Sequence, residues 1–205
     1  DAVLVRPAFP DADRAVEIRR PRPNLPSTRV LPVAMIDELS RSPEFSAVSG
    51  VYGLETVTGH TATPRTVSVE CVSPAMFDVT GVRPMLGRVF TDAESRENAA
   101  VALISYTMWQ RDFSGAPNVL DRDVVVNKAR SRIIGVMPKG FSGPRSIARV
   151  EVWAPIGAAS TGAPTFSCGR VASAMTIARV KRPLTREAVA APFLNRGFEL
   201  LRLEP

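Results

Sequence analysis

Histidine and cysteine are scarce in this chain of 205 residues, which has one histidine and two cysteines. The histidine, His60, stands in the segment GHTATP, which predicts an exposed turn, and no second histidine exists to complete a catalytic pair or a metal site. Cys71 and Cys168 are far apart, and neither belongs to a CxxC pair of the kind that holds zinc. We therefore expect no metal and no cofactor.

Long apolar runs are also absent. The longest candidate, AVALISYTMW from Ala100, is interrupted by Ser105 and Thr107, whereas a membrane-spanning helix needs roughly 20 apolar residues. The chain begins without a methionine or a signal sequence and ends on LRLEP, so we expect a fragment of a longer protein.

Two patterns typical of enzymes are missing. No serine stands in GxSxG, and the nearest glycine-rich stretch, GFSGPRS from Gly140, lacks a preceding strand-to-helix turn and a partner base. The phosphate-binding pattern GxxxxGK[ST] is absent as well, so any ATPase must be a separate subunit. We expect a protein that is not an enzyme.

The positive charge is concentrated in the last third of the chain. In residues 127–205, lysine and arginine outnumber aspartate and glutamate by 13 to 4, whereas residues 33–126 carry 7 basic and 12 acidic side chains. Nucleic-acid binding would cluster the basic residues with exposed aromatic side chains, a pattern that this sequence lacks, so we expect no nucleic-acid partner. We expect the excess of basic residues to lie on a solvated face or near an anionic membrane surface.

The 18 prolines and 13 glycines favour many short elements joined by defined turns, which predicts an α+β fold rather than a helical bundle. Residues 1–32 contain six prolines and predict an extended leading segment with one short strand over 15–18. We expect the folded domain to comprise residues 33–205. Periodicity predicts a helix from residue 33 that ends before Pro43.

Alternation of apolar and polar residues predicts most of the strands. The segments 47–60 and 66–72 form one expected strand pair, and the second has a buried face and a wet face that includes Glu70. Further along, the expected elements are strands over 100–105, 119–127, 130–138, 151–156, 174–181 and 198–205 and helices over 105–113 and 184–195. The strands 119–127 and 130–138 read as a hairpin.

The most distinctive block is VSPAMFDVTGVRPMLGRVF, residues 72–90. Ser73 and Pro74 suit the start of a short helix, which Gly81 ends. Gly87 then allows a tight turn before the next element. The arginines at either side of this turn, Arg83 and Arg88, are candidates for contact with a partner chain or with another lobe, and a salt bridge inside the domain is an equal alternative.

Other side chains have a structural and a functional interpretation. Asp121 and Asp123 lie two apart on an expected strand and predict a wet face rather than a calcium site. Trp109 and Trp153 predict core packing rather than a ligand-stacking pocket. For the two cysteines, buried free thiols and a disulfide both remain open, and the free thiols are favoured.

Several motifs together resemble the periplasmic core domain of the MacB-like and FtsX-like permeases of ABC transporters, especially duplicated permeases without a fused ATPase. They are FPDADR, VSPAMFDVTGVRPMLGRVFTDAE, VALISYTMWQRDFSGAPNVLDRDVVVN, RIIGVMPKGFSGP, VEVWAPI and IARVKRPLTREAVAA, which cover most of residues 8–191. The resemblance implies a porter-like βαβ lobe, a second β-rich lobe and a leading segment, residues 1–32, that comes from a first membrane span.

The resemblance also implies a function and partners. The domain would lie on the extracytoplasmic face of a bacterial inner membrane and couple ATP hydrolysis in a separate cytoplasmic subunit to movement outside the membrane, for efflux or for lipoprotein or peptide transport. Expected partners are that ATPase, a second permease half or protomer, and a periplasmic adaptor or substrate. Such domains usually continue beyond the LTREA-like helix, so we expect a shortened C-terminal part. The alternative is a secreted hydrolase or a carbohydrate-binding domain.

Overall fold

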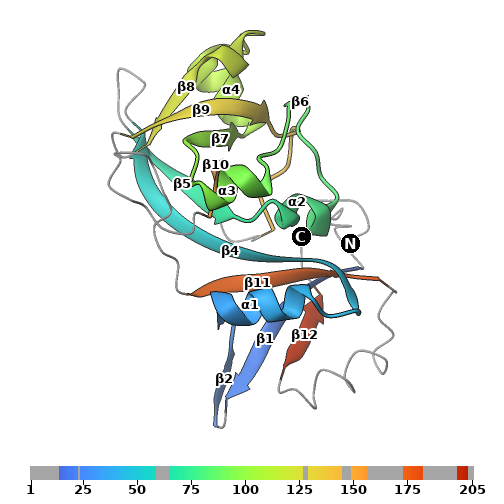
Figure 1. The fold of residues 1–205 in the computed structure, drawn as a ribbon. Coiled ribbons are helices and arrows are strands. Elements are labelled where there is room, and N and C mark those ends of the chain that lie inside the picture. The colour runs from blue at the N-terminus through green and yellow to red at the C-terminus, as the bar shows by residue number, and fades with distance from the viewer. Residues whose placement is uncertain are drawn as a thin grey trace, which may run out of the picture. The chain divides into compact units, whose positions relative to one another are not determined.

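The computed structural model describes residues 14–22, 24–58, 65–126, 129–144, 149–156, 173–181 and 198–202, which form short helices and twelve strands (Figure 1). The helices are α1 (Val33–Ser40), α2 (Ala75–Thr80), α3 (Asp92–Arg96) and α4 (Tyr106–Phe113), with a 3-10 helix, η2, at Val119–Asp121. The strands are β1 (Ala15–Arg22), β2 (Leu25–Thr28), β3 (Val30–Pro32), β4 (Phe45–Thr58), β5 (Arg65–Val72), β6 (Leu86–Gly87), β7 (Val101–Ile104), β8 (Asp123–Val126), β9 (Ala129–Val136), β10 (Val150–Pro155), β11 (Ser173–Val180) and β12 (Glu199–Arg202). The predicted α+β class is confirmed.

The chain divides into two units. Unit 1 comprises Asp1–Val51, Ala75–Val82 and Val171–Pro205, and unit 2 comprises Tyr52–Pro74 and Arg83–Arg170. The described part of the predicted leading segment, from Arg14, lies in unit 1, where it forms β1, β2 and β3. The strand predicted over residues 15–18 is therefore confirmed as part of β1.

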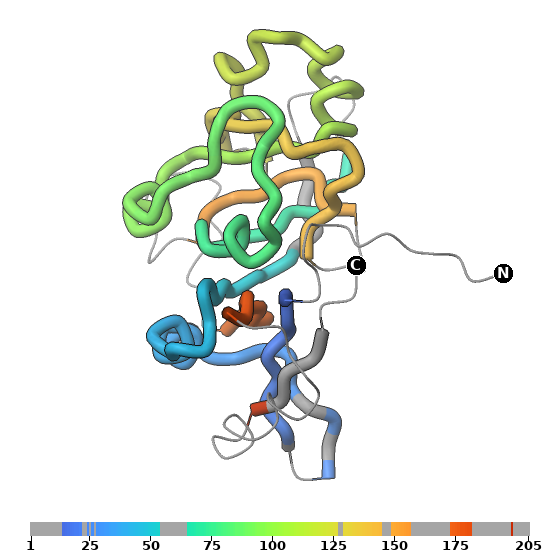
Figure 2. The backbone as a smooth tube through the Cα atoms, turned by 90° about the vertical axis from the view of Figure 1, so that its right-hand side faces the viewer, coloured from blue at the N-terminus to red at the C-terminus, as the bar shows by residue number. Residues whose placement is uncertain are grey.

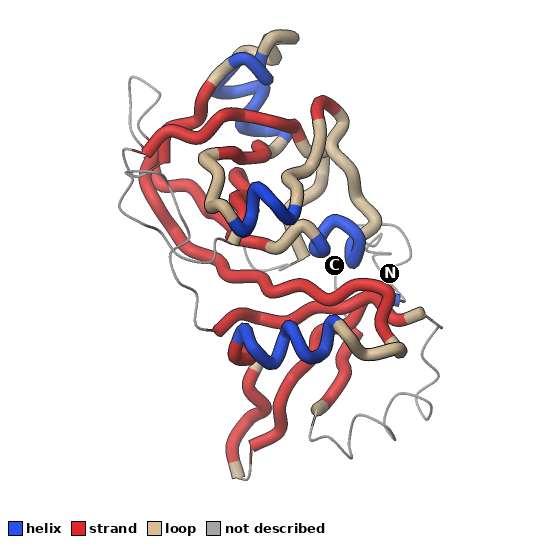
Figure 3. Tube along the Cα trace, in the orientation of Figure 1, coloured by secondary structure: helices blue, strands red, loops and turns tan. Residues whose placement is uncertain are grey.

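Unit 1 is built on an antiparallel sheet with the strand order β12-β1-β11-β4, in which β2 also pairs with β1 and β3 with β11. In Figure 2 the orange-red strand β11, seen nearly end-on, lies next to the upper end of the blue strand β1, in agreement with this pairing. Helix α1 lies along one face of the sheet (Figure 3) and buries Ile36 and Leu39 there. The core on this face also contains Val16, Ile18, Leu31, Phe45, Val48, Ala174, Ala178, Val180 and Phe198.

The two helices of unit 1 follow their sequence signals. Helix α1 coincides with the helix predicted from residue 33 to before Pro43. In α2, Gly81 adopts a φ of 71° and donates its N–H to the carbonyl of Phe77 at 2.9 Å, which ends the helix as predicted. Helix α2 packs on β11, where the Arg179 Nε donates to the carbonyl of Asp78 at 3.1 Å.

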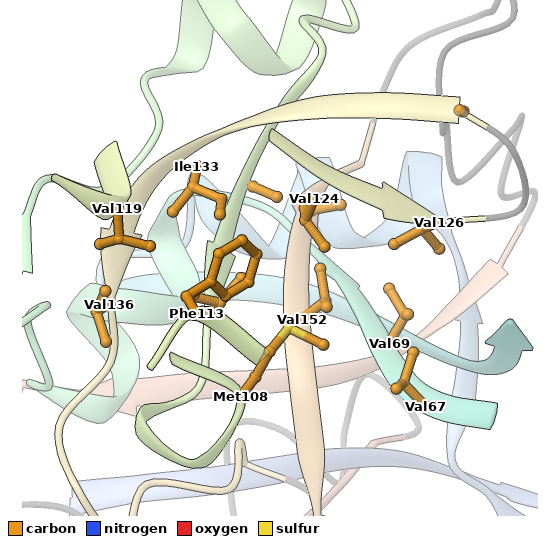
Figure 4. Packing of buried hydrophobic residues seen from close by; sticks show 14 residues of the cluster. Val67, Val69, Met108, Phe113, Val119, Val124, Val126, Ile133, Val136 and Val152 are labelled. Carbon is orange, nitrogen blue, oxygen red and sulfur yellow. The ribbon is translucent and has the colours of Figure 1, made fainter. Parts of the chain in front are cut away.

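Unit 2 is built on a mixed sheet with the strand order β5-β10-β7-β9-β6, and β8 pairs with β9. The pairs β5–β10 and β7–β9 are parallel, whereas β7–β10, β8–β9 and β6–β9 are antiparallel. Its core is a cluster of aliphatic side chains around Met108 and Phe113 of α4 (Figure 4). The other members are Val67, Val69, Ala102, Ile104, Val119, Val124, Val126, Ala129, Ile133, Val136, Val152 and Ala154.

Helix α4 begins after a serine cap and ends at a residue with a left-handed backbone. The Ser105 hydroxyl accepts the N–H of Met108 at 3.0 Å and caps the helix that was predicted from residue 105. Ser114 closes the helix in the left-handed region with a φ of 54°. Trp109 is half-buried against the core and donates its Nε1–H to the carbonyl of Ala116 at 3.0 Å, which fits the predicted packing role.

Three sequence expectations need correction or lie outside the described residues. The hairpin of β8 and β9 is confirmed, but residues 119–121 form the 3-10 helix η2, so Asp121 and Asp123 do not share a strand. The helix predicted over 184–195 lies outside the described residues, as does His60. In the part of the chain that the structure describes, no helix has the length and apolar character needed to cross a bilayer.

Candidate contact site

The candidate contact site is the loop at residues 83–90 of unit 2, called the arginine loop below. Its backbone is fixed to β9 on both sides of β6. The Met85 N–H donates to the carbonyl of Val136 at 2.8 Å, and the Arg88 N–H donates to the carbonyl of Ile134 at 2.9 Å. A loop held by sheet hydrogen bonds presents its side chains in a fixed arrangement.

Gly87 permits the close approach between this loop and β9. Its φ is 74°, and a Cβ atom added there would lie 2.1 Å from the carbonyl oxygen of Ile134. No other residue type fits that space, because real Cβ atoms do not approach a backbone oxygen so closely. The tight turn predicted at this glycine is thus a direct steric requirement.

Arg88 is engaged within unit 2. Its guanidinium donates to both carboxylate oxygens of Glu94, with distances of 2.8 Å for each, and to the carbonyl of Val89 at 3.1 Å. Glu94 also accepts the N–H of Thr91 at 2.8 Å, while the Thr91 hydroxyl accepts the N–H of Glu94 at 3.1 Å. This reciprocal capping box starts α3, so the loop and the helix are joined through one carboxylate.

The surroundings of Glu94 favour its charged form. The hydrogen bonds from Arg88 outweigh the effect of burial, and with the Thr91 backbone N–H they lower the pKa of Glu94 to about 2. Of the alternatives for Arg88, the structure thus contains the salt bridge inside the domain. Contact of Arg83 and Arg88 with a partner or another lobe stays a prediction.

The arginine loop leaves polar and apolar groups accessible together. Arg83 is exposed, 55% of the Arg88 side chain is exposed, and Met85 is 47% exposed. A flexible thioether beside guanidinium groups suits contact with a macromolecular surface, since methionine adapts its shape and arginine retains charge. This combination is why we select the loop as the candidate site.

A ring of four charged side chains lies elsewhere in unit 2. Arg65 of β5 donates to Glu151 and Asp112 at 2.6 Å each, and Arg111 donates to Asp112 at 2.9 Å and to Glu151 at 2.7 Å. The ring joins β5, α4 and β10. Each acid therefore pairs with two arginines through charge-assisted hydrogen bonds, which is typical of a structural network.

Sequence reasoning missed this ring because its members come from distant parts of the chain. Arg65 and Glu151 are 86 positions apart, and no spacing in the sequence signals that they meet. The pairing follows from the parallel alignment of β5 and β10.

Glu70 corrects the predicted wet face of β5. Its exposure is only 1%, and its carboxylate accepts the Nε1–H of the fully buried Trp153 at 3.3 Å. A Cβ atom at Gly143 would lie 2.5 Å from Glu70 Oε2, so the chain passes the carboxylate closely there. Phe141 packs on the Trp153 ring at a centroid distance of 5.3 Å. The prediction failed because the loop after β9 covers this face.

Cys71 is fully buried in β5, and it takes part in a disulfide. The favoured interpretation of a buried free thiol does not describe this residue. Cys168, the other cysteine of the chain, lies outside the described residues, so the pairing of Cys71 with Cys168 stays a prediction.

The described residues contain no group of three or more histidine, cysteine, aspartate or glutamate side chains that could hold a metal ion. Asp123 instead accepts a hydrogen bond from Arg132 at 3.2 Å and lies 3.7 Å from Arg130. Asp121 is exposed on η2.

Comparison with known proteins places this two-unit α+β domain in a family. The family model for the MacB-like periplasmic core domain matches residues 3–194, and the chain belongs to that family. The macrolide export ATP-binding/permease protein MacB of Chlorobaculum tepidum is 39% identical over 79 residues, which cover 38% of this chain and 12% of that protein. The MacB protein of Bdellovibrio bacteriovorus is 33% identical over 75 residues, which cover 36% and 11%. The matched parts thus span about a tenth of the length of these relatives.

Solved structures share the fold. The periplasmic region of MacB from Actinobacillus actinomycetemcomitans matches with a TM-score of 0.69 and 14% identity over 95% of this chain and 90% of that one. The extracellular domain of the noncanonic ABC-type transporter YknZ from Gram-positive bacteria matches with a TM-score of 0.64 and 14% identity, covering 91% of this chain and 99% of that one. At these identities the likeness concerns the fold alone.

Proposed function

We propose that this chain is a non-catalytic, extracytoplasmic domain of an ABC transporter permease, which passes movement driven by ATP hydrolysis to the outside of the inner membrane. The ATPase is a separate cytoplasmic subunit, and a second permease half completes the transporter. A periplasmic adaptor or a substrate is the partner outside the membrane. Family membership over residues 3–194 supports the assignment to this class.

The pairing of β1 with β12 is the observation that carries the proposal. These antiparallel neighbours bring Val16 opposite Arg202 and Arg19 opposite Glu199. The chain therefore enters β1 at the same end of the unit 1 sheet at which it leaves β12. A domain inserted between two membrane spans needs both connections on one side, and the leading segment before β1 would serve as the stalk from the first span.

Separate cores suit a mechanical role. Unit 1 and unit 2 each bury their own apolar cluster, which supports the proposal that each would move as a body when the attached membrane helices shift. Movement of this kind would change the surface offered to an adaptor, a lipoprotein, a peptide or another exported molecule. No cofactor is required for such transmission.

Labelling of the parent permease in intact cells tests the location. Thr107 is exposed on α4, and a Thr107→Cys variant offers one accessible thiol in unit 2. A membrane-impermeant maleimide should modify this variant in intact cells more strongly than the unsubstituted protein, whose Cys71 is buried and disulfide-bonded and which measures the background labelling. Modification only after the cells are lysed would overturn the extracytoplasmic assignment.

Distance measurement tests the transmission. Asp37 is exposed on α1, and a spin label at Asp37→Cys in both halves of the reconstituted permease reports the distance between the two copies of unit 1. Electron–electron double resonance should give different distance distributions with ATP and after hydrolysis. An ATPase subunit that cannot hydrolyse ATP is the control. Identical distributions in every nucleotide state would contradict transmission while leaving the location assignment intact.

A further inference from the structure

We propose that the two-stranded ribbon of β1 and β2, residues 19–29, is a docking surface for an acidic segment of an extracytoplasmic partner protein. Its residues are called the arginine ribbon below. We choose a protein rather than a lipid as the partner because the proposed function places the membrane at the other end of β1. This choice therefore rests on the proposed function. The contacts and charges of the ribbon itself do not depend on it.

The arginine ribbon extends beyond the sheet of unit 1 (Figures 1 and 3). The pairing of β1 with β11 ends at Ile18 and its pairing with β12 ends at Arg19, whereas its pairing with β2 starts at Arg20 and reaches Arg22. In this stretch β2 is the only strand partner of β1 among the described residues. An isolated two-stranded ribbon contributes little to folding stability. A contribution to the stability of unit 1 therefore does not explain why the chain forms this ribbon.

The ribbon carries an excess of positive charge. Its sequence contains four arginines and no acidic residue, and the nearest carboxylate on its strand is Glu17. Arg19 donates to both oxygens of Glu17 at 3.0 and 3.1 Å, and Arg29 does so at 2.8 and 3.1 Å. Glu17 thus serves two guanidinium groups, and Glu199 of β12 stands opposite Arg19. The four arginines still outnumber these two acids, which leaves a net positive charge.

Glu17 holds these arginines in a fixed position. Its exposure is 4%. Burial raises its pKa, but the hydrogen bonds and charges of Arg29 and Arg19 outweigh burial and lower the pKa below its usual value. The carboxylate thus stays charged and orients both guanidinium groups. By contrast, the Arg20 side chain is exposed to solvent, and no ion pair joins it to another side chain that the structure describes.

The ribbon is suited to bind a partner through its side chains rather than through its backbone. Pro21 in β1 and Pro26 in β2 lack the N–H that a further strand would require. Asn24 forms the turn with a φ of 58°, in the left-handed region that favours asparagine. Guanidinium groups on such a rigid ribbon match carboxylates through paired hydrogen bonds.

The direction of β1 favours a protein partner over the membrane. The strand runs from Ala15, where the chain comes from the proposed stalk, to Arg22 beside the turn. The turn therefore lies at the end of β1 that is remote from the membrane connections. In the arrangement that the proposed function implies, anionic headgroups would lie at the opposite end of β1 from this turn.

Binding of a fluorescent polyglutamate peptide to the full chain, followed by anisotropy at low salt, tests the proposal. Arg20→Glu should raise the dissociation constant about tenfold, since it replaces an attraction by a repulsion. Arg20→Gln should give a smaller loss. Arg130→Glu is the matched control, because it makes the same charge change on an exposed side chain of unit 2, and it should leave binding close to that of the unsubstituted chain. Equal losses for Arg20→Glu and Arg130→Glu would overturn the proposal.

Vesicles of phosphatidylglycerol form the second arm. The unsubstituted chain and Arg20→Glu should sediment equally with them. The proposal of a protein partner would be overturned if Arg20→Glu abolished binding to the vesicles but left binding to the peptide unchanged. That result would assign the ribbon to lipid binding. The thiol-labelling result on Thr107→Cys is independent of both arms, so a failure of the ribbon proposal can be told from a failure of the proposed location. Equal thermal unfolding of the Arg20 variants shows that their fold is retained.

Discussion

Arg88 and Glu94 form a fork-to-fork ion pair in which two hydrogen bonds of 2.8 Å join the guanidinium to the two carboxylate oxygens. The same carboxylate accepts the Thr91 N–H at the start of α3. One side chain thus fixes the end of the arginine loop and caps the following helix. Because the pKa of Glu94 is lowered from 4.5 to about 2, the folded state favours its charged form.

Replacement of Glu94 by glutamine removes the negative charge but keeps the capping hydrogen bond, since glutamine still accepts the Thr91 N–H in a capping box. We expect a loss of about 0.5 kcal/mol in the free energy of unfolding at neutral pH, the range of exposed ion pairs. A group with a lowered pKa stabilises the fold above its unfolded pKa, so this difference is complete above pH 4.5 and disappears as the pH falls towards 2. Urea unfolding of both proteins across this range measures it. A difference that does not change with pH would show that charge is not its cause.

Gly87→Ala tests the steric requirement of the arginine loop. A Cβ atom would meet the Ile134 carbonyl at 2.1 Å, and the φ of 74° is unfavourable for alanine, so we expect a loss of more than about 2 kcal/mol in the free energy of unfolding. Gly140→Ala is the matched control, because its φ is 90° but nothing lies within 4 Å of the added Cβ. It should cost only the backbone strain, about 1 kcal/mol. Equal losses in urea unfolding would contradict the steric explanation.

The elements that sequence reasoning predicted correctly have local causes. Helix α4 depends on the Ser105 cap and on the spacing of Met108 and Phe113, both of which the sequence shows directly. Gly81 and Gly87 likewise adopt positive φ values where turns were expected. These features need only a few neighbouring residues, so their chemistry can be recognised without the fold.

The errors arose where distant segments meet. Glu70 alternates with valines in β5 and therefore reads as solvent-facing, but Trp153 and Gly143 from later segments enclose it. The charge ring escaped notice for the same reason. Residues 119–121 were misassigned because two apolar residues followed by an acid fit the edge of a strand and a 3-10 turn equally well.

Asp112→Ala tests the charge ring of unit 2. The Asp112 side chain is only 4% exposed and pairs with Arg65 and Arg111, so its removal leaves two guanidinium groups to share Glu151. We expect a loss of about 2 to 3 kcal/mol in the free energy of unfolding, below the full cost of breaking a buried pair because both arginines reach solvent. Asp123→Ala is the control, since its partners Arg132 and Arg130 are exposed, and it should cost under about 0.5 kcal/mol. A similar loss for both variants in urea unfolding would show that the ring adds nothing beyond a surface pair.

Thiol counting under denaturing conditions tests the predicted disulfide. The chain has two cysteines, and Cys71 is disulfide-bonded, so a bridge to Cys168 should leave no reactive thiol before reduction and two after it. Such a bridge closes a loop of roughly 100 residues, and reduction should therefore lower the free energy of unfolding by about 4 kcal/mol in the chain-entropy account. Cys168→Ser is the control: it should expose one thiol, that of Cys71, and unfold as readily as the reduced chain. Two reactive thiols in the oxidised, denatured chain would contradict the bridge, and a dimer that reduction dissolves would assign the bond of Cys71 to a second copy.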